Sequence, residues 1–220
     1  MIAPGSAARL TVSPVLQETP VIAVLRAEEA TAYDRVVDVL VENGVRSIEL
    51  TLTTPGTSEH LPTLVKRLDD AELGVGTVTT VEQARQAVDA GASYLVAPVV
   101  DTDVIEFAVR NGVRVYPGAL SPTEVLSAWE AGATAVKIFP AETVGPQYGK
   151  HLRGPFPDLQ FIPSGGVALD DIASWLRAGA AAVSLGGPLV GDALSGGSLV
   201  DLATRARRVV DVATAERAVR

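Results

Sequence analysis

One lysine in this sequence stands where residues of a buried strand are expected. Lys137 lies in the apolar run TAVKIF, whereas Lys66 and Lys150, the other lysines of the chain, lie in polar stretches. Side chains alternate along a strand, so Lys137 faces away from Val136 and Ile138. Burial disfavours the charged form of a lysine, and the neutral amine is the form that attacks a ketone. The sequence therefore indicates an amine nucleophile, although a lysine that reaches solvent or pairs with a carboxylate would show the same pattern.

A carboxylate follows the same pattern on an earlier segment. Glu49 stands between Ile48 and Leu50 in SIEL, so its side chain faces away from both. An amine nucleophile and a carboxylate that moves protons are the minimum set for forming a Schiff base, cleaving a carbon–carbon bond and protonating the resulting enamine. A Lys137–Glu49 ion pair without catalysis remains the alternative.

An arginine ends the first apolar run, VIAVLR. Arg26 could hold a substrate carboxylate through two parallel hydrogen bonds, or it could pair on the surface with Glu28 or Glu29. Glycine-rich turns follow two later runs, at Ser164-Gly165-Gly166 and at Gly186-Gly187. Backbone N–H groups in such turns can hold a phosphate, although glycine also marks ordinary tight turns.

The same chain offers poor ligands for a metal ion. It has no cysteine, and its two histidines, His60 and His151, lie in stretches that we expect to be helical. We therefore expect an imine mechanism with no metal and no cofactor.

A repeated glycine motif indicates which elements position these residues. Gly44, Gly91, Gly112, Gly132 and Gly179 each end a polar, helix-like stretch and precede an apolar run, as a glycine at a helix C-terminus does. We expect strands near 21–25, 46–50, 72–76, 93–97, 113–116, 134–138, 159–162 and 181–185. We expect helices near 29–42, 57–70, 80–90, 101–110, 121–131, 146–152, 169–178 and 199–217. The predicted fold is α/β, a single (β/α)8 TIM barrel over residues 1–220 with an extra N-terminal helix near 6–17.

Composition narrows the partners of this domain. The net charge is −8, from 26 acidic and 18 basic residues, and no basic run is present. These features argue against nucleic acid or an anionic membrane as a partner. The N-terminus lacks the order of a signal peptide, and no apolar run approaches the ~20 residues that span a bilayer. We expect a cytoplasmic protein with a small-molecule substrate.

Several blocks of the sequence resemble one family. They are TPVIAVLR, SIELTLTTP, GVGTV, LVAPVVD, VYPGALSPTE, AVKIFPAE with GPQY close behind, and PSGGV. From about Pro20 to Leu189 the chain resembles the 2-keto-3-deoxy-6-phosphogluconate (KDPG) and 4-hydroxy-2-oxoglutarate (KHG) aldolases, including the phosphogalactonate (KDPGal) branch. The resemblance implies a metal-free class I aldolase that forms a homotrimer.

The resemblance also implies roles for individual residues. Lys137 matches the Schiff-base lysine and Glu49 the general acid/base. Arg26 and Thr77 match residues that hold the carboxylate of the pyruvoyl group, and Pro98 and Phe139 match positions that line the pocket. The phosphate-binding turns match Ser164, Gly165, Gly166, Gly186 and Gly187.

Two positions depart from the family pattern. Thr53 replaces the arginine or asparagine of the two branches, and Pro188 replaces a serine that offers its hydroxyl to phosphate. The block GPQY resembles the galactonate branch, so the configuration of the substrate stays open. We expect cleavage of KDPG or KDPGal to pyruvate and glyceraldehyde 3-phosphate. The alternatives are a KHG aldolase giving pyruvate and glyoxylate, a phosphosugar isomerase or synthase on the same barrel, and a barrel that binds keto acids without turnover.

Overall fold

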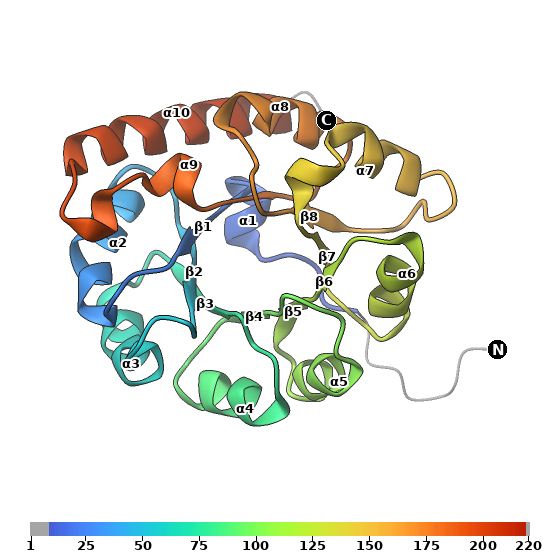
Figure 1. Cartoon of the computed structure of the whole chain (residues 1–220), viewed down its shortest axis with the longest axis horizontal. Coiled ribbons are helices and arrows are strands. Elements are labelled where there is room, and N and C mark those ends of the chain that lie inside the picture. Colours follow the sequence, from blue (N-terminus) through green and yellow to red (C-terminus); the bar gives the residue numbers. More distant parts are fainter. Residues whose placement is uncertain (1–8, 219–220) are drawn as a thin grey trace.

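The computed structural model describes residues 9–218, and in it short parallel strands form the centre and helices cover them (Figure 1). The strands are β1 (Val21–Leu25), β2 (Ser47–Thr51), β3 (Glu72–Gly76), β4 (Tyr94–Val96), β5 (Arg114–Tyr116), β6 (Gly118–Ala119), β7 (Val136–Ile138), β8 (Phe161–Pro163) and β9 (Val183–Leu185). The main helices are α1 (Pro14–Glu18), α2 (Tyr33–Glu42), α3 (Thr57–Arg67), α4 (Val81–Asp89), α5 (Thr102–Arg110), α6 (Pro122–Glu130), α7 (Pro146–Leu152), α8 (Ile172–Arg177), α9 (Gly187–Val190) and α10 (Leu199–Ala218). The predicted alternation of strand and helix is confirmed.

The strands pair in two parallel sheets. One has the order β5-β4-β3-β2-β1-β9 and the other the order β6-β7-β8. Pro117, which has no N–H to donate, separates β5, which lies within the strand predicted at 113–116, from β6, which was not predicted. A backbone hydrogen bond joins the sheets at each seam, from Thr134 N to Val115 O (3.0 Å) and from Ala181 N to Phe161 O (2.8 Å). The result is a curled parallel sheet whose concave face looks inward.

The two faces of this sheet carry different side chains. Ile48, Leu50, Val136 and Ile138 belong to the large apolar cluster between strands and helices. A second cluster fills the inside of the ring and consists of Leu16, Ile22, Tyr94, Val96, Tyr116, Ala135, Ile162 and Ala182. The predicted alternation on β2 and β7 is therefore confirmed, and it leaves Glu49 and Lys137 on the inner side.

The helix ends also match the sequence pattern. All five predicted glycine caps have positive φ, between 65° and 106°. At the other end of the helices, Thr80, Asp101 and Ser121 cap α4, α5 and α6 with their side chains. Ser121 and Glu124 form a reciprocal capping box behind Pro122. These caps set the residue at which each of the three helices begins, and so set the length of the connection from the preceding strand.

The N-terminal helix is shorter than predicted. Residues 6–8 of the expected helix lie outside the described residues, and residues 9–13 are not helical; α1 begins at Pro14. A proline disfavours helical geometry in the residue before it, and Ser13 instead caps α1 by accepting from the Leu16 amide. Leu16 of α1 fills the ring from the side where the strands begin. In the view of Figure 1, α1 lies between β1 and β8.

Other boundaries differ by a few residues. The helix predicted at 57–70 ends at Arg67, ahead of Asp69 and Asp70, and the short helix α9 was not predicted. Helix α9 has the sequence GPLV and is only about one turn long. A segment of that length is too short to show the periodicity by which a helix is predicted.

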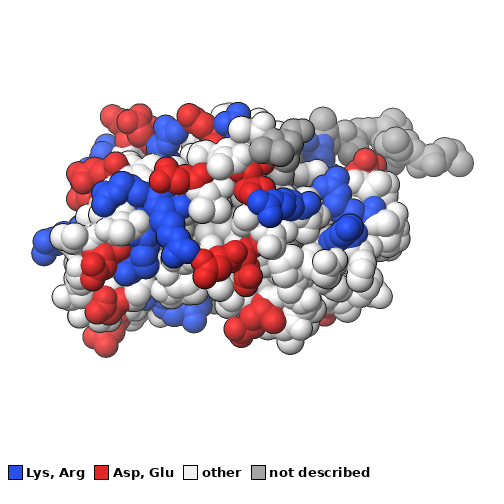
Figure 2. Space-filling view, turned by 90° about the horizontal axis from the view of Figure 1, so that it is seen from above, with Lys and Arg blue, Asp and Glu red and all other residues white. Residues whose placement is uncertain are grey.

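Charges of both signs are interleaved on the outer helices. Figure 2 shows this on the face that carries α8 and α10, where Arg208 pairs with Asp170 and Arg177 with Glu216. None of the helices within residues 9–218 combines the length and the apolar character that a membrane span requires.

Candidate active site

A pocket of about 230 Å³ opens at the carboxyl ends of the strands. It brings together every residue that the sequence analysis named for the site, from connections that lie far apart in the chain. Its lining consists of Val24, Arg26, Glu49, Thr77, Pro98, Lys137, Phe139, Ser164, Gly165, Gly166, Gly186, Gly187 and Pro188. In TIM-barrel enzymes, catalytic groups gather at the carboxyl ends of the strands.

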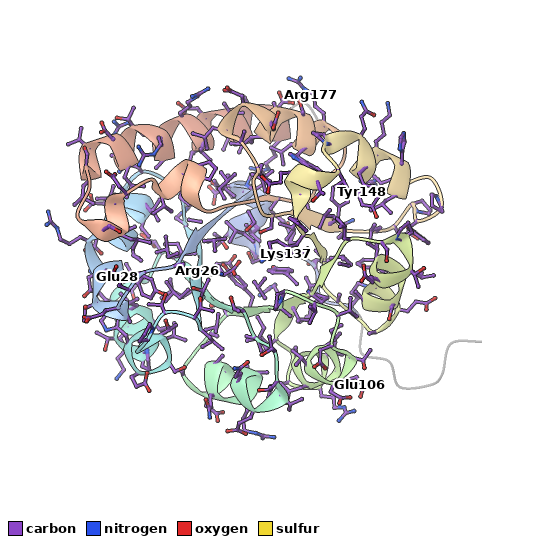
Figure 3. All side chains as sticks on the ribbon, in the orientation of Figure 1. Arg26, Glu28, Glu106, Lys137, Tyr148 and Arg177 are labelled. Atoms are coloured by element: carbon purple, nitrogen blue, oxygen red, sulfur yellow. The ribbon has the colours of Figure 1, made fainter. Side chains whose placement is uncertain are left out.

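Lys137 and Glu49 face each other across this pocket. The Lys137 Nζ lies 3.9 Å from the Glu49 Oε1, close enough for an ion pair and longer than a hydrogen bond. Glu49 is 2% exposed and Lys137 9%, so both groups are largely withdrawn from water. Figure 3 shows Lys137 near the centre of the ring. A substrate atom beside this pair would be within reach of the amine and the carboxylate together.

A glycine on the neighbouring strand makes room for this carboxylate. A Cβ added to Gly76 of β3 would lie 1.9 Å from the Glu49 Oε1, so any side chain there would displace the carboxylate. Gly74, two residues earlier, makes room in the same way for the ring of Tyr94. The sequence block GVGTV therefore has a packing reason in addition to its place beside the pocket.

An aromatic ring covers the amine from the side of the pocket mouth. Lys137 Nζ lies 5.2 Å from the centre of the Phe139 ring, within the range of a cation–π contact. The ring is 39% exposed, and a Cβ on Gly165 would approach its atoms to 2.9 Å. Phe139 thus packs against the first glycine turn and shields one side of Lys137 from solvent.

Arg26 directly follows β1 and is exposed at the mouth. Within residues 9–218 its guanidinium makes no ion pair, so the alternative of a surface pair with Glu28 or Glu29 does not hold in this structure. Figure 3 shows Arg26 on the side of Lys137, with Glu28 farther out. Its five N–H donors are available to a carboxylate.

Thr77, directly after β3, has a left-handed backbone with φ of 64°, and no other described residue besides glycine has positive φ. For a β-branched residue this conformation is strained. Residues held in such conformations concentrate at functional sites. Thr77 lines the pocket, so the strained backbone lies at the site itself.

Two substitutions at Thr77 separate this strain from the hydroxyl. Thr77→Asn is expected to raise the free energy of unfolding by about 1 kcal/mol, because asparagine tolerates the left-handed conformation. Thr77→Val keeps the branch and the strain but removes the hydroxyl. We expect it to preserve stability and to lower kcat/KM by about tenfold or more, the value of a hydrogen bond to a charged group. Urea unfolding and steady-state kinetics measure both, and an Asn variant less stable than the wild type would contradict the assignment of strain.

The turn after β8 is held from the neighbouring segment. The amide of Ala141 donates to Ser164 O (2.8 Å) and the amide of Glu142 donates to Gly165 O (3.0 Å). Within the described part of the chain, the N–H groups of Gly165 and Gly166 have no acceptor. Free, fixed N–H donors of this kind suit an anion.

Of the two residues that depart from the family pattern, Pro188 lines the pocket and Thr53 does not. Pro188 lines the pocket in the first turn of α9, where it offers neither hydroxyl nor N–H. Thr53 does not line it, and its hydroxyl donates to the Thr51 Oγ1 at 3.2 Å.

Val24 is a lining residue that the sequence analysis did not name. Alternation along β1 places it on the same face as Ile22 and Arg26, and that signal could have found it.

Aromatic residues form the floor below the pocket. Burial raises the pKa of the Tyr94 and Tyr116 hydroxyls well above the usual range, and the nearby charge of Glu72 adds to it. The two rings pack at 5.3 Å between centroids. Both phenols stay neutral at physiological pH, and both rings belong to the inner cluster of the curled sheet.

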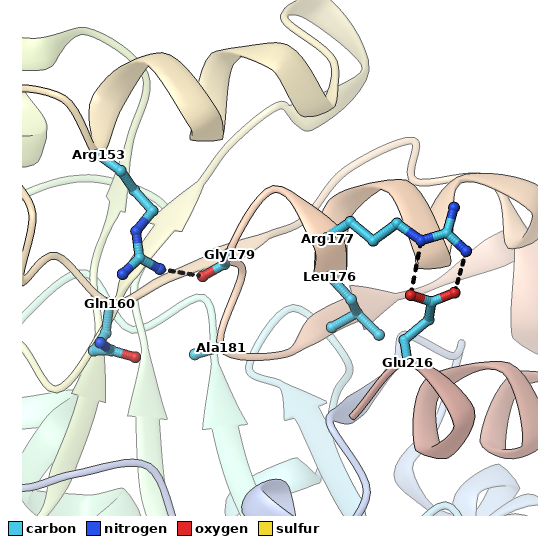
Figure 4. Close-up of a pocket in the computed structure, with 7 residues that line it drawn as sticks. All are labelled: Arg153, Gln160, Leu176, Arg177, Gly179, Ala181 and Glu216. Carbon is cyan, nitrogen blue, oxygen red and sulfur yellow. Dashed lines mark hydrogen bonds and ion pairs between the residues drawn. The ribbon is translucent and has the colours of Figure 1, made fainter. Parts of the chain in front are cut away.

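A larger pocket of about 490 Å³ lies at the opposite end of the strands (Figure 4). Its two arginines already have partners. Arg153 donates to the carbonyl of Gly179, and Arg177 forms a two-point ion pair with Glu216. These contacts anchor α7, α8 and α10 to one another and leave the groove without a free cation.

The residues that the structure describes include no group of three His, Cys, Asp or Glu side chains that could hold a metal ion. His60 lies on α3 and contacts the Asp34 Oδ1 at 3.0 Å, and His151 lies on α7. Both positions are helical, as predicted.

Comparison with known proteins identifies the family. A family model described as KDPG and KHG aldolase matches residues 12–199. The 2-dehydro-3-deoxy-6-phosphogalactonate aldolase of Escherichia coli strain K12 is 37% identical over 175 residues, which cover 77% of this chain and 84% of that protein. A solved structure described as native KDPGal has a TM-score of 0.83 at 33% identity and covers 90% of this chain and 95% of that chain. The KDPG aldolase of Legionella pneumophila, solved with pyruvate captured at low pH as a covalent carbinolamine intermediate, has a TM-score of 0.77 at 25% identity and covers 91% of this chain and 95% of that chain. The match over most of its length shows that the chain belongs to the KDPG and KHG aldolase family.

Proposed function

We propose that this protein is a class I aldolase that cleaves KDPG or KDPGal to pyruvate and glyceraldehyde 3-phosphate through a Schiff base on Lys137. The observation that carries the proposal is the pairing of a buried lysine with a buried carboxylate, 3.9 Å apart, in a pocket at the carboxyl ends of the strands. A phosphosugar isomerase or synthase would have no use for that lysine. The galactonate-type relative and the captured pyruvate of the Legionella enzyme support the aldolase.

The geometry suggests how each group acts. The neutral amine of Lys137 attacks the C2 carbonyl of the substrate, and loss of water gives the protonated imine. Glu49 then accepts the proton of the C4 hydroxyl as the C3–C4 bond breaks. The electron pair of that bond moves to the protonated imine, which becomes an enamine. Glu49 returns the proton to C3, and hydrolysis releases pyruvate and the free amine. One carboxylate within reach of the amine is sufficient for all of these proton transfers.

The rest of the pocket binds the two ends of the substrate. Arg26, with the Thr77 hydroxyl, holds the carboxylate of the pyruvoyl group, and Pro98 and Phe139 pack against its carbon chain. The N–H groups of Gly165, Gly166, Gly186 and Gly187 donate hydrogen bonds to the phosphate oxygens. The pocket contains no cation besides Arg26 and Lys137, so the phosphate depends on these backbone donors.

This function rests on a closed scaffold. We infer that the two sheets form one (β/α)8 barrel in a single domain over residues 1–220, in which β5 and β6 together make one of the eight strands, since a backbone hydrogen bond crosses each seam. A homotrimer and a cytoplasmic location remain expectations from the family resemblance and the composition.

The preference between phosphorylated and short substrates tests the phosphate turns. We expect a higher kcat/KM for KDPG or KDPGal than for 4-hydroxy-2-oxoglutarate, because the backbone donors remain despite Pro188. Pro188→Ser adds one hydroxyl donor to a charged group, worth roughly 1.5–3 kcal/mol, or about one to two decades in affinity. The gain should appear only with the phosphorylated substrate.

The same measurements define the alternative. If the wild type prefers 4-hydroxy-2-oxoglutarate and Pro188→Ser gains nothing with the phosphorylated acid, the turns are structural. The protein is then a KHG aldolase that yields pyruvate and glyoxylate. Pro188, which directly follows the Gly186-Gly187 turn and offers neither a hydroxyl nor an N–H to a phosphate there, is the observation that favours this alternative.

A further inference from the structure

Ser184 lies behind the pocket and contacts a residue that lines it. Ser184 is on β9, and Ser164 directly follows β8. The Ser164 hydroxyl donates to the Ser184 Oγ at 3.2 Å, and the two residues are 4% and 3% exposed. Ser164 lines the pocket, whereas Ser184 does not.

This hydrogen bond fixes which part of the Ser164 hydroxyl faces the cavity. A serine hydroxyl has one proton and two acceptor lone pairs, and its proton can rotate to any partner. With the proton directed at Ser184, the lone pairs are left for the pocket. Ser164 then meets the substrate as an acceptor, although the sequence resemblance placed it among the donors to a phosphate.

The environment of Ser184 leaves few other reasons for a hydroxyl there. Ala182, which directly precedes β9, shares the inward face with Ser184 by strand alternation, and it is apolar and belongs to the inner cluster. A buried hydroxyl is costly unless it is hydrogen-bonded, and within the described residues the recorded partner of Ser184 is Ser164. The hydroxyl of Ser184 therefore acts through Ser164.

We propose that Ser184 is a positioning residue of the active site, which orients the Ser164 hydroxyl so that it accepts a hydrogen bond from a hydroxyl group of the bound substrate. The inference rests on the proposed aldolase function and adds a residue to it that does not touch the substrate. It also assigns Ser164 to the hydroxyl-bearing carbon chain and leaves the phosphate to backbone donors alone.

A double-mutant cycle tests the inference. Ser184→Ala, Ser164→Ala and the double variant are compared with the wild type for kcat/KM on the phosphorylated hexonate and on 4-hydroxy-2-oxoglutarate. We expect Ser184→Ala to lower kcat/KM by about threefold to tenfold with both substrates, the size of one neutral hydrogen bond. In the Ser164→Ala background the second change should cost nothing more, because the residue through which Ser184 acts is gone.

A matched control comes from another buried pair of hydroxyl groups. Ser47 on β2 donates to the Tyr94 hydroxyl at 3.2 Å, and neither residue lines the pocket. Ser47→Ala removes a hydroxyl–hydroxyl bond of the same length and is expected to leave kcat/KM unchanged. Thermal unfolding of every variant checks that the fold is kept. If Ser184→Ala does not fold, Ser184→Cys enters the cycle, because sulfur keeps the volume but is a weak acceptor.

The outcomes separate this inference from the proposed function. If pyruvate and borohydride leave no adduct on the wild type, the aldolase mechanism fails. If the adduct forms but the losses of the two single variants multiply in the double variant, only the positioning role is overturned. A Ser164→Ala loss confined to the phosphorylated substrate would overturn the acceptor role and return Ser164 to the phosphate.

Discussion

Borohydride added together with pyruvate is expected to inactivate this protein and to leave a pyruvate-derived mass on Lys137. Pyruvate forms an imine with the buried amine, and reduction converts the imine into a secondary amine that water cannot hydrolyse. Lys66 and Lys150 are exposed and do not line the pocket, so pyruvate has no binding site beside their amines. The expected result is a single modified site and complete loss of cleavage. Peptide mass mapping identifies the modified residue, and an assay of residual activity measures the loss of cleavage.

Two controls accompany this experiment. Borohydride without pyruvate should leave activity intact, and Lys137→Arg, which keeps the charge but forms no imine, should be inactive and unlabelled. An adduct on Lys66 or Lys150, or none at all, would sink the Schiff-base mechanism.

Glu49→Gln is expected to lower kcat by about 10²–10⁴ while pyruvate can still be trapped on Lys137. The amide keeps the size of the side chain in the space left by Gly76 but cannot carry a proton between the C4 hydroxyl and C3. General acid–base groups contribute factors of this size. Single-turnover kinetics with the cleavable substrate, beside the rate of borohydride trapping with pyruvate, separates proton transfer from imine formation.

Glu72 offers a matched control for Glu49. It is the other carboxylate buried on the inner face, 8% exposed at the opposite end of the ring, where it accepts a hydrogen bond from the Ser13 hydroxyl at 2.8 Å. Glu72→Gln is expected to change stability but to leave kcat near that of the wild type. Turnover in Glu49→Gln close to that of Glu72→Gln would mean that Glu49 serves only as the ion-pair partner of Lys137.

The local features of the fold were predictable because they depend on short-range physics. Glycine after each helix, short runs of Val, Ile and Leu, and the alternation around Lys137 and Glu49 are readable within a few residues. The alternation alone predicts that Lys137 and Glu49 lie on the inner face of the sheet. The break at Pro117 follows from the missing N–H of proline, yet the predicted strand stopped at 116 without its continuation in β6. The predicted N-terminal helix started too early in the sequence, because Pro14 disfavours helical geometry in the residue before it and α1 begins at Pro14.

Distances and partners across the ring were decided only by the tertiary structure. The approach of Lys137 to Glu49, the room that Gly76 leaves, and the Ser164–Ser184 bond join segments separated by 20 to 88 residues in sequence. The strained backbone of Thr77 and the unpaired guanidinium of Arg26 likewise depend on what surrounds them. The sequence by itself determined which residues face inward, because strand alternation is local. Which of them meet was set by the pairing of strands and the packing of helices around them, a global arrangement to which all the contacts contribute together.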